Sequence, residues 1–215
     1  MSFSTPGQPA ELFMVEELIE ATRGFHTRGW TYGTGGNFSI LTRRDPLQVF
    51  ITASGVDKGN LSRSTFVLVE EMSFSGQGVP SAETDLHLKI YEKTQAQAVM
   101  HTHSIAGTVL SERFAQNRQL KISGLEMLKG LAGVTTHEHT EVIPILPNSQ
   151  DMSALSREVD DLFATHPTMH GFLLAGHGLT TWGRTVEEAK RHVEILEFLL
   201  AVQLEREKLG TQRSI

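Results

Sequence analysis

Two histidines close an apolar run in the segment QAVMHTHSIAG, residues 97–107. Side chains at positions i and i+2 of an extended strand lie on the same side, so His101 and His103 are expected to project together, with their Cα atoms about 7 Å apart. Neutral imidazole is a common ligand of divalent zinc, and two rings at this spacing could converge on one ion. Pairs of polar residues at strand ends are also ordinary, so this pattern alone leaves a structural role open.

A third histidine, His177, lies between two glycines after an apolar run in LLAGHGLTTWG. Glycine on both sides lets the backbone bend, so that the ring could reach inward from a turn. A catalytic zinc site keeps three protein ligands and one open position for substrate. His177 could therefore complete a site with the pair at 101 and 103; the alternative is a histidine on a surface turn.

Two glycine-rich turns, TGGNFS and TASGVDKG, carry groups that could bind a phosphate. Gly36 and Asn37 can expose consecutive backbone N–H groups, and Ser54 and Gly55 offer a hydroxyl and another open turn. Lys58 would add positive charge. The P-loop pattern with its lysine is absent, so neither segment is a nucleotide signature, and plain turns are the alternative.

Two glutamates are candidates for proton transfer. Glu83 stands at the start of a predicted helix, where the helix dipole favours a carboxylate, so helix capping is the alternative to catalysis. Glu126 lies in SGLEMLKGLAGVTTHE among small and apolar residues, where a carboxyl group is expected to have a raised pKa and to exchange protons near neutral pH. The alternative is a solvated loop acid. His137 and His139 in TTHEHTE lie among polar residues and are interpreted as loop histidines that could lie near an interface.

Hydrophobic periodicity predicts the elements that must position these side chains. Helices are expected at residues 11–25, 81–94 with Ser81 as N-cap, 104–115, 151–166 and 185–210. Strands are expected at residues 96–103 and 140–146, as a pair within 171–183, and as a hairpin-like pair within 38–55. The elements mix without strict βαβ alternation, which favours a three-layer α/β/α domain with a central, largely antiparallel sheet.

Length and composition exclude several classes of protein. The 215 residues predict a single domain over 1–215, with residues 1–10 as a flexible N-terminal segment. A formal charge of -6 and a pI near 5.9 argue against a nucleic-acid or membrane-surface binder. The chain has no cysteine, which excludes disulfides and thiolate chemistry. It shows no signal peptide and no apolar run near ~18 residues, so a cytoplasmic protein is expected.

The order of the motifs resembles the class II aldolase/adducin superfamily. The shared segments are TGGNFS, TASGVDKG, SAETDLH, HTHS and AGHGL. Within the superfamily, the segments KISGLEMLKGLAGVTTHEHTEVIPILPNSQDM and HGLTTWGRTVEEAKRHVEILEFLL resemble the methylthioribulose-1-phosphate dehydratase family. The resemblance covers about Leu12 to Leu204, and residues 126–151 are its most specific part.

The resemblance implies roles for the candidate residues. It makes His101, His103 and His177 the ligands of one Zn²⁺ per subunit. Glu126 corresponds to the acid/base glutamate of the dehydratases, whereas Glu83 occupies the position of the catalytic carboxylate of sugar-phosphate aldolases, so its role stays open. The implied phosphate ligands are Gly36, Asn37, Ser54, Gly55 and Lys58. A homotetramer with sites near subunit contacts is also implied.

The implied reaction is the dehydration of a ketose 1-phosphate. Zinc would act as a Lewis acid on the C2 carbonyl, while Glu126 would take the C3 proton and protonate the departing 4-hydroxyl, which yields a 2,3-diketone of methionine salvage. One alternative is a class II sugar-phosphate aldolase or a pentulose-phosphate epimerase on the same fold. The other is a non-catalytic, adducin-like binding protein, since a fold alone does not define a function.

Overall fold

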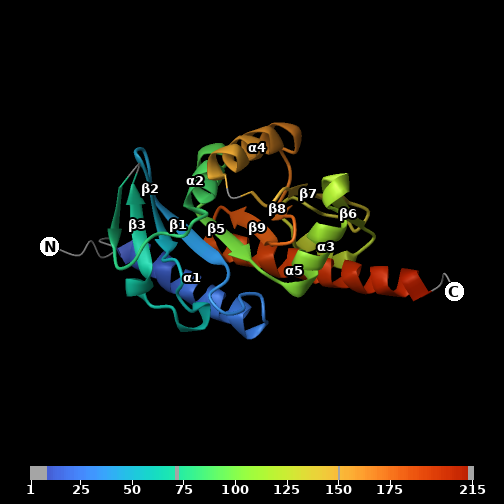
Figure 1. Ribbon diagram of the computed structural model, residues 1–215, viewed down its shortest axis with the longest axis horizontal. Helices are drawn as coiled ribbons and strands as arrows, with labels where there is room; N and C mark the ends of the chain where they lie inside the picture. Colours follow the sequence, from blue (N-terminus) through green and yellow to red (C-terminus); the bar gives the residue numbers. More distant parts are fainter. Residues whose placement is uncertain (1–8, 71–72, 150, 213–215) are drawn as a thin grey trace.

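The computed structural model describes residues 9–70, 73–149 and 151–212 (Figure 1). The strands of this part of the chain form one sheet in the order β4-β3-β2-β1-β5-β9-β8-β7-β6. All neighbouring strands are antiparallel except β7 and β8. The strands are β1 (Asn37–Arg44), β2 (Leu47–Thr52), β3 (Phe66–Glu70), β4 (Ser73–Gly76), β5 (Ala98–Thr102), β6 (Gln119–Ser123), β7 (Thr140–Leu146), β8 (Gly171–Leu174) and β9 (Gly178–Gly183).

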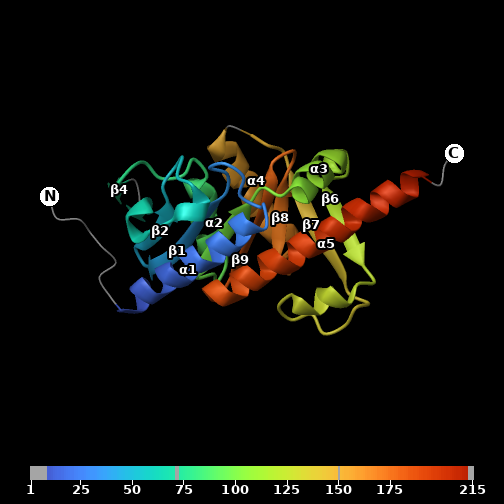
Figure 2. The same cartoon turned by 90° about the horizontal axis from the view of Figure 1, so that it is seen from below.

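Helices cover both faces of the sheet, and this confirms the predicted three-layer α/β/α architecture. Helices α1 and α5 lie side by side on one face with α3, and α2 and α4 cover the other (Figures 1 and 2). The helices are α1 (Pro9–Thr27), α2 (Thr84–Lys93), α3 (Ile105–Arg113), α4 (Met152–Thr165) and α5 (Val186–Gln212). Short 3₁₀ turns, among them η1 (Lys58–Asn60) and η4 (Glu126–Gly130), connect the main elements.

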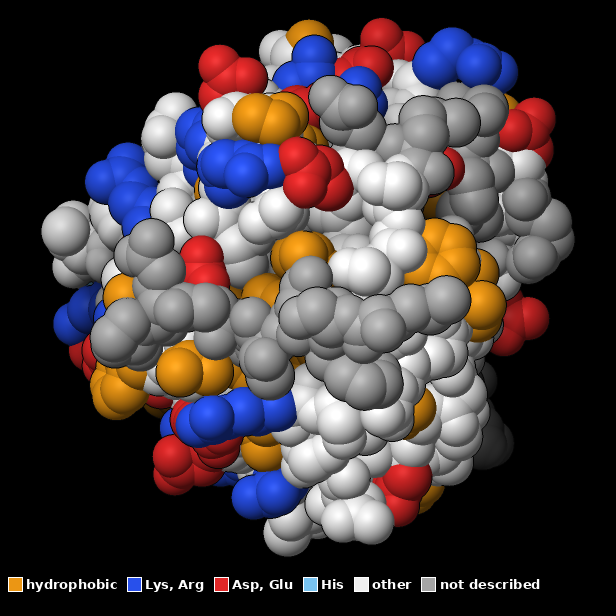
Figure 3. Space-filling view, turned by 90° about the vertical axis from the view of Figure 1, so that its left-hand side faces the viewer, with side chains coloured by type: hydrophobic (Ala, Val, Ile, Leu, Met, Phe, Trp, Pro, Cys, Tyr) orange, Lys and Arg blue, Asp and Glu red, His pale blue; other side chains and the backbone are white. Residues whose placement is uncertain are grey.

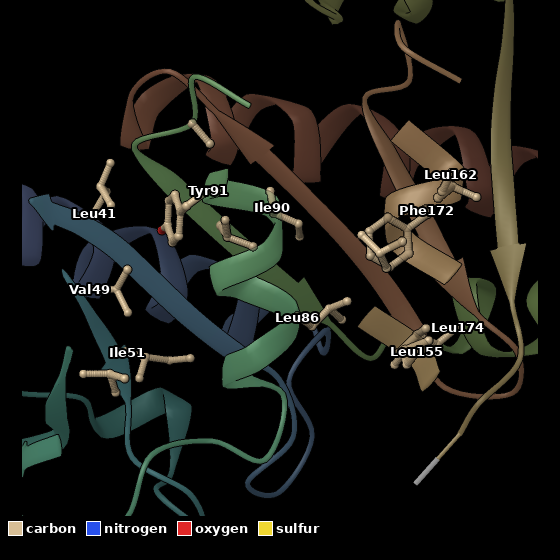
Figure 4. Close-up of a cluster of buried hydrophobic side chains, with 14 of the residues drawn as sticks. Leu41, Val49, Ile51, Leu86, Ile90, Tyr91, Leu155, Leu162, Phe172 and Leu174 are labelled. Atoms are coloured by element: carbon tan, nitrogen blue, oxygen red, sulfur yellow. The ribbon is translucent and has the colours of Figure 1, made fainter. Parts of the chain in front are cut away.

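The core beneath α2 shows how sequence periodicity fixes this architecture. Leu86, Ile90 and Tyr91 recur at helical spacing and are all buried, as predicted. Figure 4 shows these side chains between those of β1 and β2 on one side and those of β8 and α4 on the other. Burying a large apolar side chain contributes about 1.5–3 kcal/mol, so this cluster holds α2 firmly against the sheet.

The local predictions differ from the structure at a few places. Helix α2 begins at Thr84 after Glu83, so Ser81 is not its N-cap; instead the Ser81 carbonyl accepts a hydrogen bond from the Thr84 hydroxyl at 2.6 Å. Strands β3, β4 and β6 were not predicted. Residues 1–8 of the predicted flexible segment lie outside the described residues, and α1 already begins at Pro9.

Charged side chains are mixed on the surface. On the face shown in Figure 3, the described Lys and Arg side chains alternate with Asp and Glu, and apolar side chains are scattered between them. Within residues 9–70, 73–149 and 151–212, no helix has the length and the apolar composition needed to cross a lipid bilayer.

Candidate metal centre

Strand β5 and the β8–β9 turn bring three histidines together. In the antiparallel pairing of β5 with β9, His101 lies opposite Thr180 and Thr102 lies opposite Leu179. The chain positions just beyond these pairs, His103 after β5 and His177 before β9, therefore meet at the same end of these two central strands. Strand β5 is held on both sides, because it also pairs with β1 through Asn37 and His101.

The glycines that flank His177 have distinct roles. Gly176 has a φ of +65°, the left-handed conformation that favours glycine in the turn after β8. At Gly178 a Cβ atom would lie 2.0 Å from the Thr102 carbonyl oxygen and 3.1 Å from ring atoms of His101 and His103. The second glycine therefore leaves space for the histidine cluster, a packing role that the sequence pattern did not indicate.

The Nε2 atoms of the three rings converge. His101 Nε2 lies 2.8 Å from His103 Nε2 and 3.4 Å from His177 Nε2. The Nδ1 atom of His101 lies 3.0 Å from the Leu179 carbonyl oxygen, to which it donates, and this leaves the lone pair on Nε2 directed into the cluster. Lone pairs facing one another at this distance suit a shared cation. The donor set fits a metal ion, and the group could hold one.

The protonation states suit the same role. Burial lowers the pKa of His101 to about 3, and burial together with the neighbouring imidazoles lowers the pKa of His103 to about 3. Both rings are therefore neutral at pH 7, which is the form that binds a metal.

Glu83 is the carboxylate of this site. Its Oε2 atom lies 3.5 Å from His101 Nε2, and its Oε1 atom lies 3.5 Å from His177 Nδ1. The Asn37 amide donates to Oε2 at 2.6 Å, and the Glu83 side chain is buried. Although Glu83 occupies the N-cap position of α2, its side chain makes no capping hydrogen bond. The carboxylate therefore faces the histidine cluster rather than its own helix.

A buried polar network fixes the helix that carries Glu83. His87, one turn further along α2, has its Nδ1 atom 2.7 Å from the Ser39 hydroxyl of β1, which lies 2.8 Å from the Tyr91 hydroxyl. Burial lowers the pKa of His87 to about 3, so the ring is neutral. These bonds join α2 to β1 close to the contact between Asn37 and Glu83 and hold that carboxylate in place.

A pocket of about 210 Å³ lies beside the histidine cluster, and the residues predicted to bind phosphate line it. Its lining includes Gly36, Asn37, Ser54, Gly55 and Lys58 together with Glu83, His103 and His177. At Gly36, with a φ of +80°, a Cβ atom would lie 2.7 Å from the His101 carbonyl oxygen, so glycine is needed for this close approach. The two glycine-rich turns therefore face the same space as the histidines.

Lys58 forms part of the wall of this pocket. Its side chain is almost fully buried, and Nζ donates to the carbonyl oxygens of Thr34 at 2.8 Å and Val56 at 2.9 Å. Burial lowers its pKa to about 8, so the group is largely charged at pH 7. An ammonium group carries three N–H bonds, and these two contacts leave one for a ligand in the pocket.

Comparison with known proteins defines the family. Residues 16–204 match the family model described as "Class II Aldolase and Adducin N-terminal domain". The chain belongs to this family. Two curated relatives are methylthioribulose-1-phosphate dehydratases: the protein of Sorangium cellulosum is 45% identical over 188 residues, which cover 86% of this chain and 88% of the relative, and that of Pectobacterium atrosepticum is 47% identical over 197 residues, which cover 89% and 94%.

Solved structures agree with the class II aldolase fold. The L-fuculose-1-phosphate aldolase from Thermus thermophilus superposes with a TM-score of 0.74 at 22% identity, over 93% of this chain and 98% of that one. At this identity the similarity shows the shared fold alone.

The structure of this class II aldolase family member does not bring Glu126 to the histidines of the same chain. Strand β7 runs from Thr140, which pairs with the end of β6, to Leu146, which lies opposite Leu174 beside the His177 turn. These six residue steps span about 20 Å. The segment between β6 and β7, which carries Glu126, therefore begins and ends at the opposite end of the strands, and Glu126 does not line the pocket.

The surroundings of Glu126 also differ from the prediction. Its side chain is 71% exposed and pairs with Lys129, and His137 Nδ1 lies 3.7 Å from its Oε2 atom. The hydrogen bond from Lys129 lowers the pKa of Glu126, so the expectation of a raised pKa was wrong. Small and apolar neighbours in sequence did not bury this carboxyl group.

Sequence reasoning missed a buried acid behind the centre. Glu197 of α5 accepts a hydrogen bond from Thr102, the residue between His101 and His103, and burial raises its pKa to about 7. The signal was present in the sequence, because Glu197 interrupts the apolar face of the helix in VEILEFLL. The apolar face of a helix packs against the core, so an acid within that face is expected to be buried.

Proposed function

We propose that this protein is a zinc-dependent methylthioribulose-1-phosphate dehydratase. It would remove water from 5-methylthioribulose 1-phosphate to give 2,3-diketo-5-methylthiopentyl 1-phosphate in methionine salvage. The observation that carries the proposal is the 45–47% identity, over most of both chains, to relatives with this activity. The convergence of three histidines, a carboxylate and a polar pocket supports it.

We propose one Zn²⁺ per subunit, held by His101, His103 and His177. Three imidazoles with an open fourth position are a typical catalytic zinc set. When bound, the ion supplies a Lewis acid that polarises the carbonyl oxygen of the substrate and acidifies the neighbouring C–H bond.

The phosphate of the substrate would bind at the glycine-rich turns. The backbone N–H groups near Gly36 and Gly55 and the Ser54 hydroxyl line the pocket and can donate to phosphate oxygens. Lys58 would contribute its charge and hold both turns through the bonds to Thr34 and Val56. In this pose the C2–C4 carbons, which follow the phosphorylated C1, would face the histidines.

Two carboxylates remain candidates for moving the protons. Dehydration removes the C3 proton and the 4-hydroxyl, and the resulting enol becomes the diketone when C4 is protonated. Glu83 already faces the centre, with Oε2 held by Asn37 and Oε1 available for a proton. Glu126 could act only on a centre that a neighbouring subunit brings to it. We propose this arrangement within a homotetramer whose sites lie near subunit contacts. Each chain would fold as one domain over residues 1–215, and the tetramer would act in the cytoplasm.

A class II sugar-phosphate aldolase is the second candidate function. The observation that favours it is the position of Glu83 beside the histidines, since a carboxylate there can serve carbon–carbon cleavage as well as dehydration. The two reactions differ in what leaves the substrate, which is water in one and an aldehyde in the other.

Product analysis tests the proposal. The purified protein, with its metal content measured, is incubated with 5-methylthioribulose 1-phosphate, and the product is followed by mass spectrometry. Loss of one water with the carbon skeleton intact, abolished by a chelator and restored by Zn²⁺, is the expected result. A triose-type fragment would support the aldolase, and no conversion by the zinc-loaded protein would refute the dehydratase.

A complementation experiment tests the role of Glu126. His103→Ala and Glu126→Gln variants are each expected to be inactive, and they are mixed as subunits in equal amounts. If Glu126 acts across a subunit contact, about one quarter of the sites combine an intact centre with an intact glutamate and regain turnover. Mixed oligomers without activity would refute this arrangement, and an active Glu126→Gln variant would leave proton transfer to Glu83.

A further inference from the structure

A second cluster of buried titratable groups lies at the opposite end of the strands from the histidine centre. His170 directly precedes β8, Glu141 lies on β7 and His192 lies on α5; the side chains of His170 and Glu141 are 11% and 3% exposed. The rings of His170 and His192 meet edge to face, with centroids 5.2 Å apart. A cavity of about 750 Å³ borders the two rings, so they are close to solvent without being open to it.

Both ring nitrogens of His170 face acceptors. Nδ1 lies 3.0 and 3.1 Å from the two carboxylate oxygens of Glu141, and Nε2 lies 2.8 Å from the carbonyl oxygen of Ala132. Glu141 also receives His139 Nε2 at 2.9 Å and the backbone N–H of His170, a set of donors that favours an ionised carboxylate. A neutral imidazole carries one N–H, so only an imidazolium satisfies both acceptors.

His192 shows the opposite pattern. Its Nδ1 atom donates to the Trp182 carbonyl oxygen at 2.7 Å, and its Nε2 atom accepts the N–H of Ala132 at 3.2 Å. A ring that donates on one side and accepts on the other is neutral. The cationic His170 therefore binds the carbonyl of Ala132, while the neutral His192 binds its N–H.

Ala132 lies in the middle of the β6–β7 segment, residues 124–139, which also carries Glu126. Further contacts hold the same part of this segment, since Arg191 of α5 donates to the Gly130 carbonyl at 3.0 Å and Leu131 is buried. Figure 2 shows the segment, in yellow-green, beyond the lower edge of α5.

We propose that His170 and His192 form a histidine clasp on Ala132 that positions the β6–β7 segment, and that the clasp closes only while His170 carries a proton. His170 is thus a positioning residue, not a catalytic one. The consequence for catalysis rests on the proposed function, because the segment matters to the reaction only if Glu126 acts on a neighbouring centre.

The charged neighbours define the pH window of the clasp. The titratable groups around His170 are Glu141 from β7, His139 from the segment, and Glu188 and His192 from α5. Burial and the charge of Arg191 lower the pKa of His192, and Lys93 and Arg184 line the adjoining cavity. Burial lowers the pKa of His170, but the hydrogen bond and charge of Glu141 outweigh it and raise the pKa above 6.5.

The sign of the effect follows from the two shifts. Because the folded-state pKa of His170 is raised, its contribution is complete below about pH 6.5 and is lost as the pH rises through the raised value. Burial raises the pKa of Glu141, yet the bonds from His170 and His139 lower it overall, so its contribution persists above about pH 4.5. The clasp is therefore closed in mildly acidic solution and opens as the pH rises through the raised pKa of His170.

Hydrogen–deuterium exchange of peptides from residues 124–139 tests the clasp without substrate. Wild-type protein, His170→Gln and the matched control His166→Gln are compared at pH 6 and pH 9, with rates corrected for intrinsic exchange. Wild type and the control are expected to lose protection about tenfold or more at pH 9, the factor for one charge-assisted hydrogen bond. His170→Gln is expected to show low protection at both pH values. Equal protection of the wild type at both pH values, or an unchanged pH step in His170→Gln, would overturn the proposal.

A measurement on the wild type keeps the test valid if the variant does not fold. Nitrogen NMR of ¹⁵N-histidine-labelled protein should show both ring nitrogens of His170 protonated at pH 6.5, and a neutral ring would overturn the proposal. If the exchange step is present but dehydratase turnover does not follow it, the clasp stands and the assigned role of Glu126 is wrong.

Discussion

Replacement of Glu197 by glutamine should stabilise the protein in a strongly pH-dependent way. Glu197 is fully buried behind the histidine centre, and burial raises its pKa from 4.5 to about 7. The folded state therefore binds the Glu197 proton more tightly than the unfolded state does. The contribution of Glu197 to the free energy of unfolding is therefore complete below about pH 4.5 and falls as the pH rises to about 7. Above that pH it changes no further.

The size of the effect follows from the shift. A difference of one pKa unit corresponds to about 1.36 kcal/mol, so a shift from 4.5 to about 7 gives about 3 kcal/mol between pH 4.5 and pH 8. Glutamine has the shape of the protonated acid, can still accept from the Thr102 hydroxyl, and never ionises. In a chain of this length about 3 kcal/mol corresponds to roughly 6–12 °C in Tm.

The assay is thermal unfolding of wild type and Glu197→Gln at fixed protein and metal concentration, at steps from pH 5 to pH 8.5. Glu205→Gln, on the exposed side of the same helix, is the matched control, and its Tm should follow the wild type at every pH. The Tm difference between Glu197→Gln and wild type should grow with pH and level off near pH 8, with unchanged metal content. A difference that is the same at pH 5 and pH 8 would refute the reasoning, because the Glu197 carboxyl would then not be linked to protons.

Three further predictions concern the centre and its pocket. His103→Ala should lower metal content and turnover together, because it removes one of three ligands; unchanged metal occupancy by elemental analysis would place the site elsewhere. Lys58→Ala should raise KM more than it lowers kcat, and it should also lower Tm by several degrees, because Nζ holds two buried carbonyl groups; an effect on kcat alone would contradict the phosphate role. Gly178→Ala should abolish metal binding or folding, since its Cβ would lie 2.0 Å from the Thr102 carbonyl oxygen; a folded variant with wild-type metal content would contradict this geometry.

Periodicity predicted the buried elements well and the sheet edges poorly. Strand β5 is buried throughout, and its apolar run marked it clearly. At the two edges, β4 is fully exposed and β6 alternates buried and polar positions over only five residues, so neither has enough apolar character to stand out. Strand β3, beside β4, was missed as well. The predicted helix start at Ser81 was also wrong. Glu83 takes the N-cap position of α2, although its side chain makes no capping hydrogen bond and faces the site instead.

The two glutamates show where sequence reasoning reaches its limit. A pKa depends on burial and on charges that distant segments bring near, and neighbouring sequence does not fix these. Glu126 has apolar neighbours in the chain but is exposed and paired with Lys129. Glu83 reads as a helix cap but lies buried between Asn37 and the histidines.

The sequence by itself determined the centre wherever the chemistry depends on local geometry. The alternation of side chains in a strand placed His101 and His103 on one side, and the flanking glycines marked His177 as a turn residue that can face inward. Only the tertiary structure decided what surrounds these groups. The register of β5 against β9 brings the three rings together, and the packing of α2 brings Glu83 to them. The length of strand β7 keeps Glu126 away from the centre of its own chain. The physical reason is that strand and turn geometry act over a few residues, whereas burial and electrostatic contact depend on which elements pack together.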